Sequence, residues 1–285
     1  MVNMVDERFE LMAVIFRLAG RPEYSDLGTD YQREVAETFA SSVAHEAVEY
    51  AKSLPLGYDA VFKFSVHIEK KGRRFAFIKD IDSLFDGRWT DKSAKKFLIL
   101  LNQFYMDTDY ATFFNAHNAL FEQCTQTFID QAYGKIDFSW FRKYIGPSNL
   151  RCIYSLSSGN YGATVNNQII CCLVRRDGGA LVHEYCHGFA NPIADQWYHE
   201  NPEFQKWCDD SVNPEQMPYY NNGFAMAREY VTRAYTVLYQ VQHGAELGPC
   251  LAAERHSNGR DSFRYIGQIY HMVAEFDQFK QQYAL

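Results

Sequence analysis

The sequence lacks several features that would assign it to a class at once. It has no apolar run of membrane-spanning length, and residues 1–10 do not combine a basic stretch with an apolar one. No cysteine pair has the C-x-x-C spacing of a structural zinc site. Seven cysteines, an odd number, do not form a dense disulfide framework, so we expect most of them to be small buried residues.

We therefore expect that this chain carries no signal peptide, and this expectation leaves two locations open. Either the protein stays inside the cell, or this chain is a mature form from which a leader has been removed and which is exported or displayed at the cell surface. The sequence favours neither location. It does predict that the chain has no transmembrane segment.

Positive charge is also scarce. The chain has 28 Lys and Arg against 35 Asp and Glu, which gives a net charge of −7. A general nucleic-acid binder needs a basic surface to neutralise phosphates, so we expect no nucleic-acid partner. The one dense basic run, Lys70, Lys71, Arg73 and Arg74, is typical of a solvated hairpin tip rather than a phosphate-binding patch.

Apolar periodicity predicts an α+β protein that is mainly helical. Helical spacing covers residues 6–19 and 31–52, and residues 93–133 form two helices that break near 107–109. Alternating residues from 62 to 68 return through 74–78 as a β-hairpin, and residues 150–174 form a small antiparallel sheet. A short helix lies in the connector 134–149, and after a loop near Asn191–Pro192 helices continue to the C-terminus.

The length of 285 residues suits one large domain or two lobes that share a core, and we expect a single domain. Within it, residues 1–149 are expected to form a helical part with the hairpin, and residues 150–285 a zinc-binding part. The zinc-binding part would place the small sheet beside a motif helix that starts after Gly178 and Gly179.

The strongest chemical signal is "HEYCH" at residues 183–187, which matches H-E-x-x-H. On a helix, His183 and His187 lie one above the other, so both rings can bind one zinc ion. Glu184 comes one residue later, where it can take a proton from a zinc-bound water without binding the metal itself. The flanking residues are apolar, which favours a dry site in which the metal acts strongly.

A catalytic zinc needs a third protein ligand and leaves a fourth position for water. The variant with a third histidine is excluded, because Ala190 and Ile193 stand where its glycine and histidine would be. Glu229 is the best candidate, since it lies among apolar and small residues where a carboxylate needs a partner. The alternative is a structural ion pair with Arg233, four residues on. Three other acids occur in a wetter segment and are weaker candidates: Glu200, Glu203 and Glu215.

This pattern resembles the zincin metallopeptidases with a glutamate ligand, the gluzincins. More narrowly, "LVHEYCHGFANP" with "REYVTRAY" resembles a bacterial domain-of-unknown-function family regarded as zinc peptidases. "ERFELMAVIFRLAG" and "FFNAHNALF" are similar to that family as well, so the likeness extends over most of the chain.

The resemblance implies one Zn2+ per chain held by His183, His187 and Glu229, with Glu184 as general base. It also implies a sheet whose edge strand binds an extended peptide. In the thermolysin-like branch, an aspartate follows the ligand glutamate by four residues. Here that position is Arg233, so the surroundings of the ligand must differ.

Supporting roles remain open at this point. Asn191 or Asp195 could accept the second N–H of a metal-bound histidine, although both could equally cap local structure. Cys186 is expected to be a core residue and His117 a hydrogen-bonded core histidine. Several side chains are candidates for stabilising the charge that develops during attack: Tyr219, Tyr220, His199, Arg228 and Arg233.

Three functions are compatible with these residues. The preferred one is a zinc metallopeptidase acting on a peptide or protein substrate. The others are a non-catalytic peptide- or glycan-binding protein that retains the zincin shape, and a zinc amidase acting on a non-peptide substrate. A metal site closed by four protein ligands would favour the binding protein. The sequence does not fix the oligomeric state.

Overall fold

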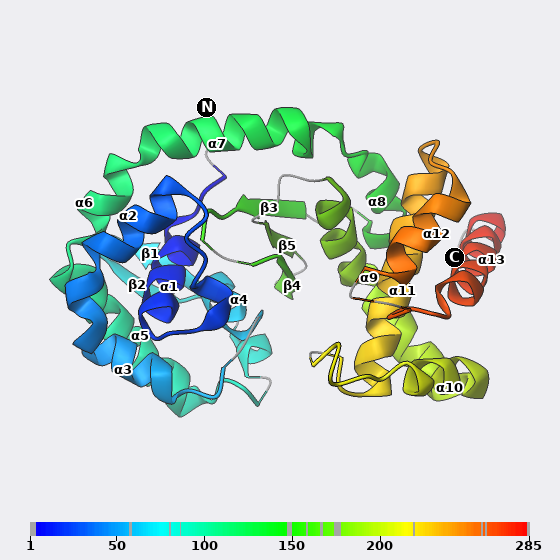
Figure 1. The fold of residues 1–285 in the computed structure, drawn as a ribbon, viewed down its shortest axis with the longest axis horizontal. Helices are drawn as coiled ribbons and strands as arrows, with labels where there is room; N and C mark the ends of the chain where they lie inside the picture. The colour runs from blue at the N-terminus through cyan, green and yellow to red at the C-terminus, as the bar shows by residue number, and fades with distance from the viewer. Residues whose placement is uncertain are drawn as a thin grey trace. The chain divides into compact units, whose positions relative to one another are not determined.

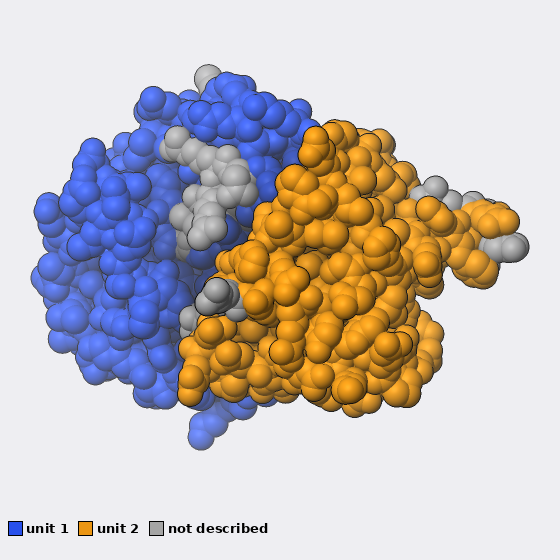
Figure 2. All heavy atoms as spheres, turned by 45° about the vertical axis from the view of Figure 1, so that its right-hand side comes forward, with its two compact units in different colours: residues 1–136, 148–180 blue, residues 137–147, 181–285 orange. Residues whose placement is uncertain are grey.

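The computed structural model describes residues 4–56, 59–79, 81–85, 87–146, 150–157, 159–165, 168–173, 178–218, 220–257, 259 and 261–283. These residues form an α+β fold that is mainly helical and has two small sheets, as predicted (Figure 1). The chain divides into two compact units, coloured separately in Figure 2. Unit 1 comprises Met1–Ile136 and Ser148–Ala180, and unit 2 comprises Asp137–Pro147 and Leu181–Leu285. The strands after residue 149 therefore group with the N-terminal residues, unlike the expected division at 149/150.

Unit 1 begins with a helix that was predicted. Helix α1, Glu7–Leu18, starts at Asp6, whose carboxylate accepts from the amide of Arg8. The expected single helix over 31–52 is wrong. It divides into α2, Asp30–Thr38, and α3, Glu46–Ser53, which are joined by a 3-10 turn. The break has a local cause, because the His45 ring accepts from the amide of Ala47 and caps a new helix.

The middle of unit 1 contains three helices where two were expected. Helix α5, Asp91–Asp107, ends where the break near 107–109 was predicted. The chain then forms α6, Tyr110–Ala116, and α7, Asn118–Gln131, separated at His117. The ring of His117 packs against aromatic rings while its Nδ1 lies 2.8 Å from the carbonyl oxygen of Phe113, which agrees with its expected structural role.

The predicted hairpin exists, but its first strand is shorter than expected. Residues 59–66 form helix α4, Asp59–Val66, and strand β1 begins only at Ile68. Strand β1, Ile68–Lys71, pairs antiparallel with β2, Arg74–Phe77. The alternation of Phe62, Phe64 and Val66 was misleading because α4 is buried on most of its surface, so its apolar residues need not follow the helical period.

The second sheet is mixed, so the prediction of an antiparallel sheet is wrong. Its strands are β3, Leu150–Tyr154, β4, Tyr161–Val165, and β5, Gln168–Leu173, in the order β3-β5-β4. Strand β5 is antiparallel to β4 but parallel to β3. Alternating residues identify strands without giving their order, and a centrally inserted third strand makes the β3–β5 pair parallel.

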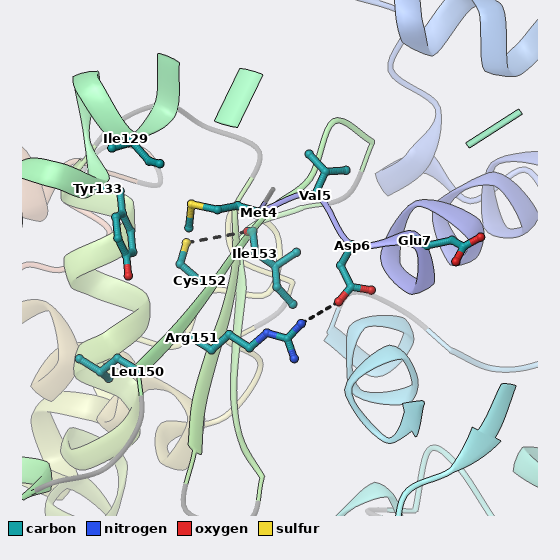
Figure 3. A pocket seen from close by; sticks show the side chains of 10 residues that line it. All are labelled: Met4, Val5, Asp6, Glu7, Ile129, Tyr133, Leu150, Arg151, Cys152 and Ile153. Atoms are coloured by element: carbon teal, nitrogen blue, oxygen red, sulfur yellow. Dashed lines mark hydrogen bonds and ion pairs between the residues drawn. The ribbon is translucent and has the colours of Figure 1, made fainter. Parts of the chain in front are cut away.

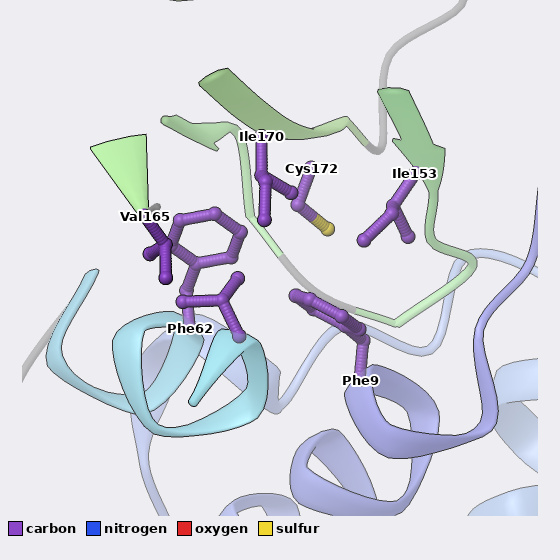
Figure 4. Close-up of a cluster of buried hydrophobic side chains, with 7 residues drawn as sticks. Phe9, Phe62, Ile153, Val165, Ile170 and Cys172 are labelled. Atoms are coloured by element: carbon purple, nitrogen blue, oxygen red, sulfur yellow. The ribbon is translucent and has the colours of Figure 1, made fainter. Parts of the chain in front are cut away.

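One face of this sheet builds part of the unit 1 core. Phe9 of α1 and Phe62 of α4 point at the sheet in Figure 4. Burial of such rings is a main source of folding free energy. The contributing side chains are Phe9, Phe62, Val66, Ile153, Val165, Ile170 and Cys172.

Unit 2 is built from helices around α11, Gly223–Gln242, which packs against three neighbours. These are α10, Pro202–Asp210, α12, Leu247–Arg255, and α13, Ile266–Tyr283. Helix α8, Phe138–Ile145, is the predicted short helix of the connector. Among the described residues, no helix is both long and apolar enough to cross a membrane.

The motif helix α9, Gly178–Glu200, is longer than predicted. The loop expected near Asn191–Pro192 is wrong, because the helix continues through both residues. Pro192 has no amide hydrogen, so the carbonyl of Gly188 lacks its usual donor. Packing outweighs this loss: Phe189 stacks on Tyr144 at 4.4 Å between ring centroids, and Ala190 and Ala194 are fully buried.

Candidate metal centre

The two motif histidines point toward one another from α9. Their spacing of four residues places them on the same face of the helix. The Nε2 atoms of His183 and His187 lie 3.2 Å apart, and their rings are nearly perpendicular at 88°. Burial lowers the pKa of His183 to about 3, so its ring is neutral and keeps a lone pair.

Helix α11 brings Glu229 to the same point. Its Oε1 lies 3.4 Å from His183 Nε2, and its Oε2 lies 3.7 Å from His187 Nε2. One ligand atom from each of the three residues lies within 4.8 Å of the others. Two imidazole nitrogens and a carboxylate oxygen are a donor set that metal ions bind, so this group could hold one ion.

Glu229 is ionised although it is only 3% exposed. Burial would raise the pKa of its carboxyl, but the charge of Arg233 is the largest opposing cause, and the pKa is lowered to about 2. Arg233 Nη2 lies 2.7 Å from Glu229 Oε1. The structural ion pair that was the alternative reading is therefore present, and it coexists with the approach to both histidines.

His187 is held from its second ring nitrogen. Its Nδ1 lies 3.1 Å from Asn191 Oδ1, one turn along α9, and 3.0 Å from Thr232 Oγ1 on α11. A metal-binding histidine commonly donates its other N–H to such an oxygen, which fixes the ring orientation. Asn191 lies where it was expected, whereas the contact from Thr232 was not anticipated.

Glu184 is half-buried on α9, directly after His183. Because a helix turns by about 100° per residue, its side chain leaves α9 to one side of the histidine face. Cys186 lies between the histidines in sequence but is fully buried, as expected for a core residue. Burial raises the pKa of its thiol, so the sulfur stays protonated. Among the described residues, Cys186 is not part of the group formed by His183, His187 and Glu229, which we call the metal group.

The remaining candidates have different surroundings. Asp195 accepts two hydrogen bonds from Arg228, at 2.6 and 2.7 Å, and among the described residues no hydrogen bond joins it to His183 or His187. Burial, followed by the charge of Glu229, raises the pKa of Tyr220, which keeps its proton beside the metal group. His199 packs against the rings of Tyr198 and Phe224. Tyr219 lies outside the described residues, and the weaker acids Glu200, Glu203 and Glu215 are exposed and outside the group.

Sequence reasoning missed the residues that hold Arg233. Its Nη1 bonds to Glu254 Oε2 of α12 and lies 2.7 Å from Ser257 Oγ, just after that helix. The guanidinium also stacks over the ring of Phe263 at 4.2 Å. A buried arginine needs an anionic partner and further hydrogen-bond acceptors, and this general rule was the only available signal.

A separate cavity occurs within unit 1 (Figure 3). It has a volume of about 570 Å3 and lies between the segment that precedes α1, the end of α7 and strand β3. Arg151 and Asp6 form an ion pair at 2.8 Å in its wall. None of the residues predicted to act in catalysis or metal binding lines this cavity, and the expectation that a sheet edge binds a peptide stays a prediction.

Comparison with known proteins adds no relative. No family model matches the chain, no curated protein matches it, and no solved structure matches it. What the chain's own residues establish is an α+β fold with a buried His183, His187 and Glu229 group that could bind a metal ion.

Proposed function

We propose that this protein is a zinc-dependent hydrolase, and more narrowly a metallopeptidase of the glutamate-ligand zincin type. The observation that carries the proposal is the convergence of His183, His187 and Glu229 from two helices. The donor set matches the two histidines and one glutamate of catalytic zinc sites. Zinc bound there would lower the pKa of a coordinated water and polarise a substrate carbonyl.

The number of ligands supports a catalytic role over a structural one. Among the described residues, no fourth His, Cys, Asp or Glu joins the group. Structural zinc sites are closed by four protein ligands, whereas catalytic sites keep one position open for water or substrate. The open position favours an enzyme over a binding protein that only retains the shape.

The chain's own residues supply the rest of the proposed chemistry. Glu184, which follows His183 on α9, would accept a proton from the attacking water and deliver it to the leaving group. Glu229 stays ionised through Arg233, and Asn191 with Thr232 orients the ring of His187. Tyr220 keeps its proton and can donate a hydrogen bond next to Glu229.

Elemental analysis and an activity screen on a mixed-peptide library test this proposal. We expect about one zinc per chain, lost in His183→Ala and in His187→Ala. Glu184→Gln should keep the zinc and lower peptide hydrolysis by about 10²- to 10⁴-fold, because only the proton acceptor is removed.

Glu200→Gln is the matched control, since Glu200 is exposed on the same helix and should change neither zinc content nor activity. A wild-type protein that binds no zinc would contradict the metal site. Full zinc content with an equally active Glu184→Gln variant would contradict the assigned proton acceptor. Hydrolysis of non-peptide amides alone would replace the peptidase with an amidase.

A further inference from the structure

We infer that Arg233 is a positioning residue for the metal group: anchored from α12, its guanidinium holds one oxygen of Glu229 and leaves the other to the metal. The inference rests on the metal site proposed above, and it assigns a role to the residue that departs from the thermolysin-like pattern. It implies that Glu229 binds the ion through a single oxygen.

The contact with Glu229 is short and dry. Arg233 follows Glu229 by one helical turn on α11, and its Nη2 lies 2.7 Å from Oε1. The two side chains are 10% and 4% exposed, so little water competes for either charge. Oε1 also lies 3.4 Å from His183 Nε2, and Oε2 lies 3.7 Å from His187 Nε2. The ion pair with Arg233 thereby limits movement of the carboxylate away from the two imidazoles.

Arg233 is itself held from the opposite side. Its Nη1 bonds to Glu254 and to Ser257, and its Cζ lies over the ring of Phe263, 4.2 Å from the centroid. A planar group with partners at two edges and a ring beside it has little freedom to rotate. Movement of Glu229 away from the histidines would break the ion pair with a fixed partner.

Charge near a metal ligand acts in two opposing ways. The positive charge of Arg233 repels a bound cation, which weakens binding. Against this, Arg233 fixes Glu229, and Glu254 supplies a second negative charge that offsets the arginine. With two carboxylates and one guanidinium, the three groups carry a net charge of −1. We therefore expect positioning to outweigh repulsion.

Zinc affinity of Arg233→Met separates the two effects. If Arg233 positions Glu229, competition with a chromogenic chelator should reveal a fall in affinity of about 10- to 100-fold. If the arginine acts only through its charge, its removal should leave the affinity unchanged or increase it, and this result would overturn the inference. Arg255→Met is the matched control, because Arg255 is an exposed arginine on α12 that pairs with Asp261 and should not affect zinc.

Cobalt(II) gives a readout that a general loss of packing would not change. In Arg233→Met saturated with cobalt, the released carboxylate of Glu229 can bind through both oxygens, which raises the coordination number. The visible d–d absorption should then lose intensity relative to the cobalt-loaded wild type. An identical spectrum at saturation would overturn the single-oxygen assignment.

If Arg233→Met does not fold, the zinc affinity of Arg233→Lys is measured instead. Lysine keeps the charge but replaces the planar fork by a single ammonium, which cannot bridge Glu229 and Glu254 in the same way. A lower zinc affinity than wild type supports positioning, and wild-type affinity overturns it. Failure of the wild type to bind zinc or cobalt would refute the proposed metal site itself, which keeps the two failures distinct.

Discussion

Among the described residues, each unit buries one glutamate almost completely, and the two residues behave in opposite ways. Glu10 of unit 1 is 1% exposed, and its Oε1 accepts from the Ser155 hydroxyl at 2.6 Å and the Leu156 amide at 2.9 Å. Burial, only partly offset by these neutral donors, raises the pKa of Glu10. Glu229 of unit 2 is as buried but faces a guanidinium and two imidazoles, and its pKa falls to about 2.

Burial alone therefore does not mark a functional carboxylate. Glu10 ties α1 to the residues after β3 and stays protonated to higher pH, as a structural hydrogen-bonding group does. Glu229 is kept charged, which a metal ligand requires. The deciding feature is the charge of the neighbours rather than the depth of the site.

The largest effect should come from removing each carboxylate in turn. We expect Glu229→Gln to lose stoichiometric zinc binding, because the site loses its only anionic ligand and Arg233 is left with less compensation. Glu10→Gln should retain one zinc per chain. Elemental analysis of both purified variants checks the contrast, and equal zinc contents would show that the two sites were wrongly distinguished.

A smaller effect, on stability, is expected from a substitution at Gly223, the first residue of α11. A Cβ added at Gly223 would lie 1.7 Å from Asp209 Oδ1 and 2.8 Å from the Tyr198 hydroxyl. In Gly223→Ala the Asp209 side chain would have to move and lose its hydrogen bond from Tyr198, so we expect the free energy of unfolding to fall by about 0.5–1.5 kcal/mol, measured by urea denaturation. Gly248→Ala is the control, since nothing lies within 4 Å and helical alanine should add about 0.4–1 kcal/mol. Equal stabilities of the two variants would contradict the close packing of α10 on α11.

The smallest expected effect is on how the stability of the fold depends on pH. The pKa of Glu10 is raised above its usual 4.5, so the folded metal-free protein binds more protons than the unfolded chain above that value. The contribution of Glu10 is then full at low pH and is lost as pH rises through the raised pKa. Glu229, with its pKa lowered to about 2, contributes above its usual 4.5 and loses that contribution only as pH falls toward 2.

Urea denaturation between about pH 4 and about pH 8 tests the sign for Glu10. Relative to wild type, Glu10→Gln should remove part of the decline in stability with rising pH. A wild type and variant whose stabilities run parallel over the whole range would show that Glu10 ionises normally.

Sequence patterns predicted the metal group better than the fold around it. Helical spacing fixes the relation between His183 and His187, and an isolated acid in an apolar helix identified Glu229. Those inferences depend on residues within one element and on the cost of burying charge. The contacts of Thr232 and Glu254 could not be found in this way, because they depend on how α11 meets other helices.

The errors in the fold share a physical cause. Residues 59–66 are buried around most of α4, so their apolar pattern carried no reliable period. The packing of Phe189 and Ala190 stabilises α9 across Pro192, although a proline by itself favours a break in the helix. The parallel pairing of β3 with β5 depends on strand order, which alternation does not encode. In each case tertiary context outweighed local preference.

The buried sulfur of Cys186 has a practical consequence for handling the protein. Thiols react with electrophiles as thiolates, and burial disfavours that form at Cys186 as well as at Cys152 and Cys208, since it raises the pKa of each. Alkylating agents and mild oxidants should thus spare the helix that bears the two imidazoles. Stripping and restoring a metal bound as proposed should therefore leave Cys186 unmodified without a small-molecule thiol that would compete for the ion.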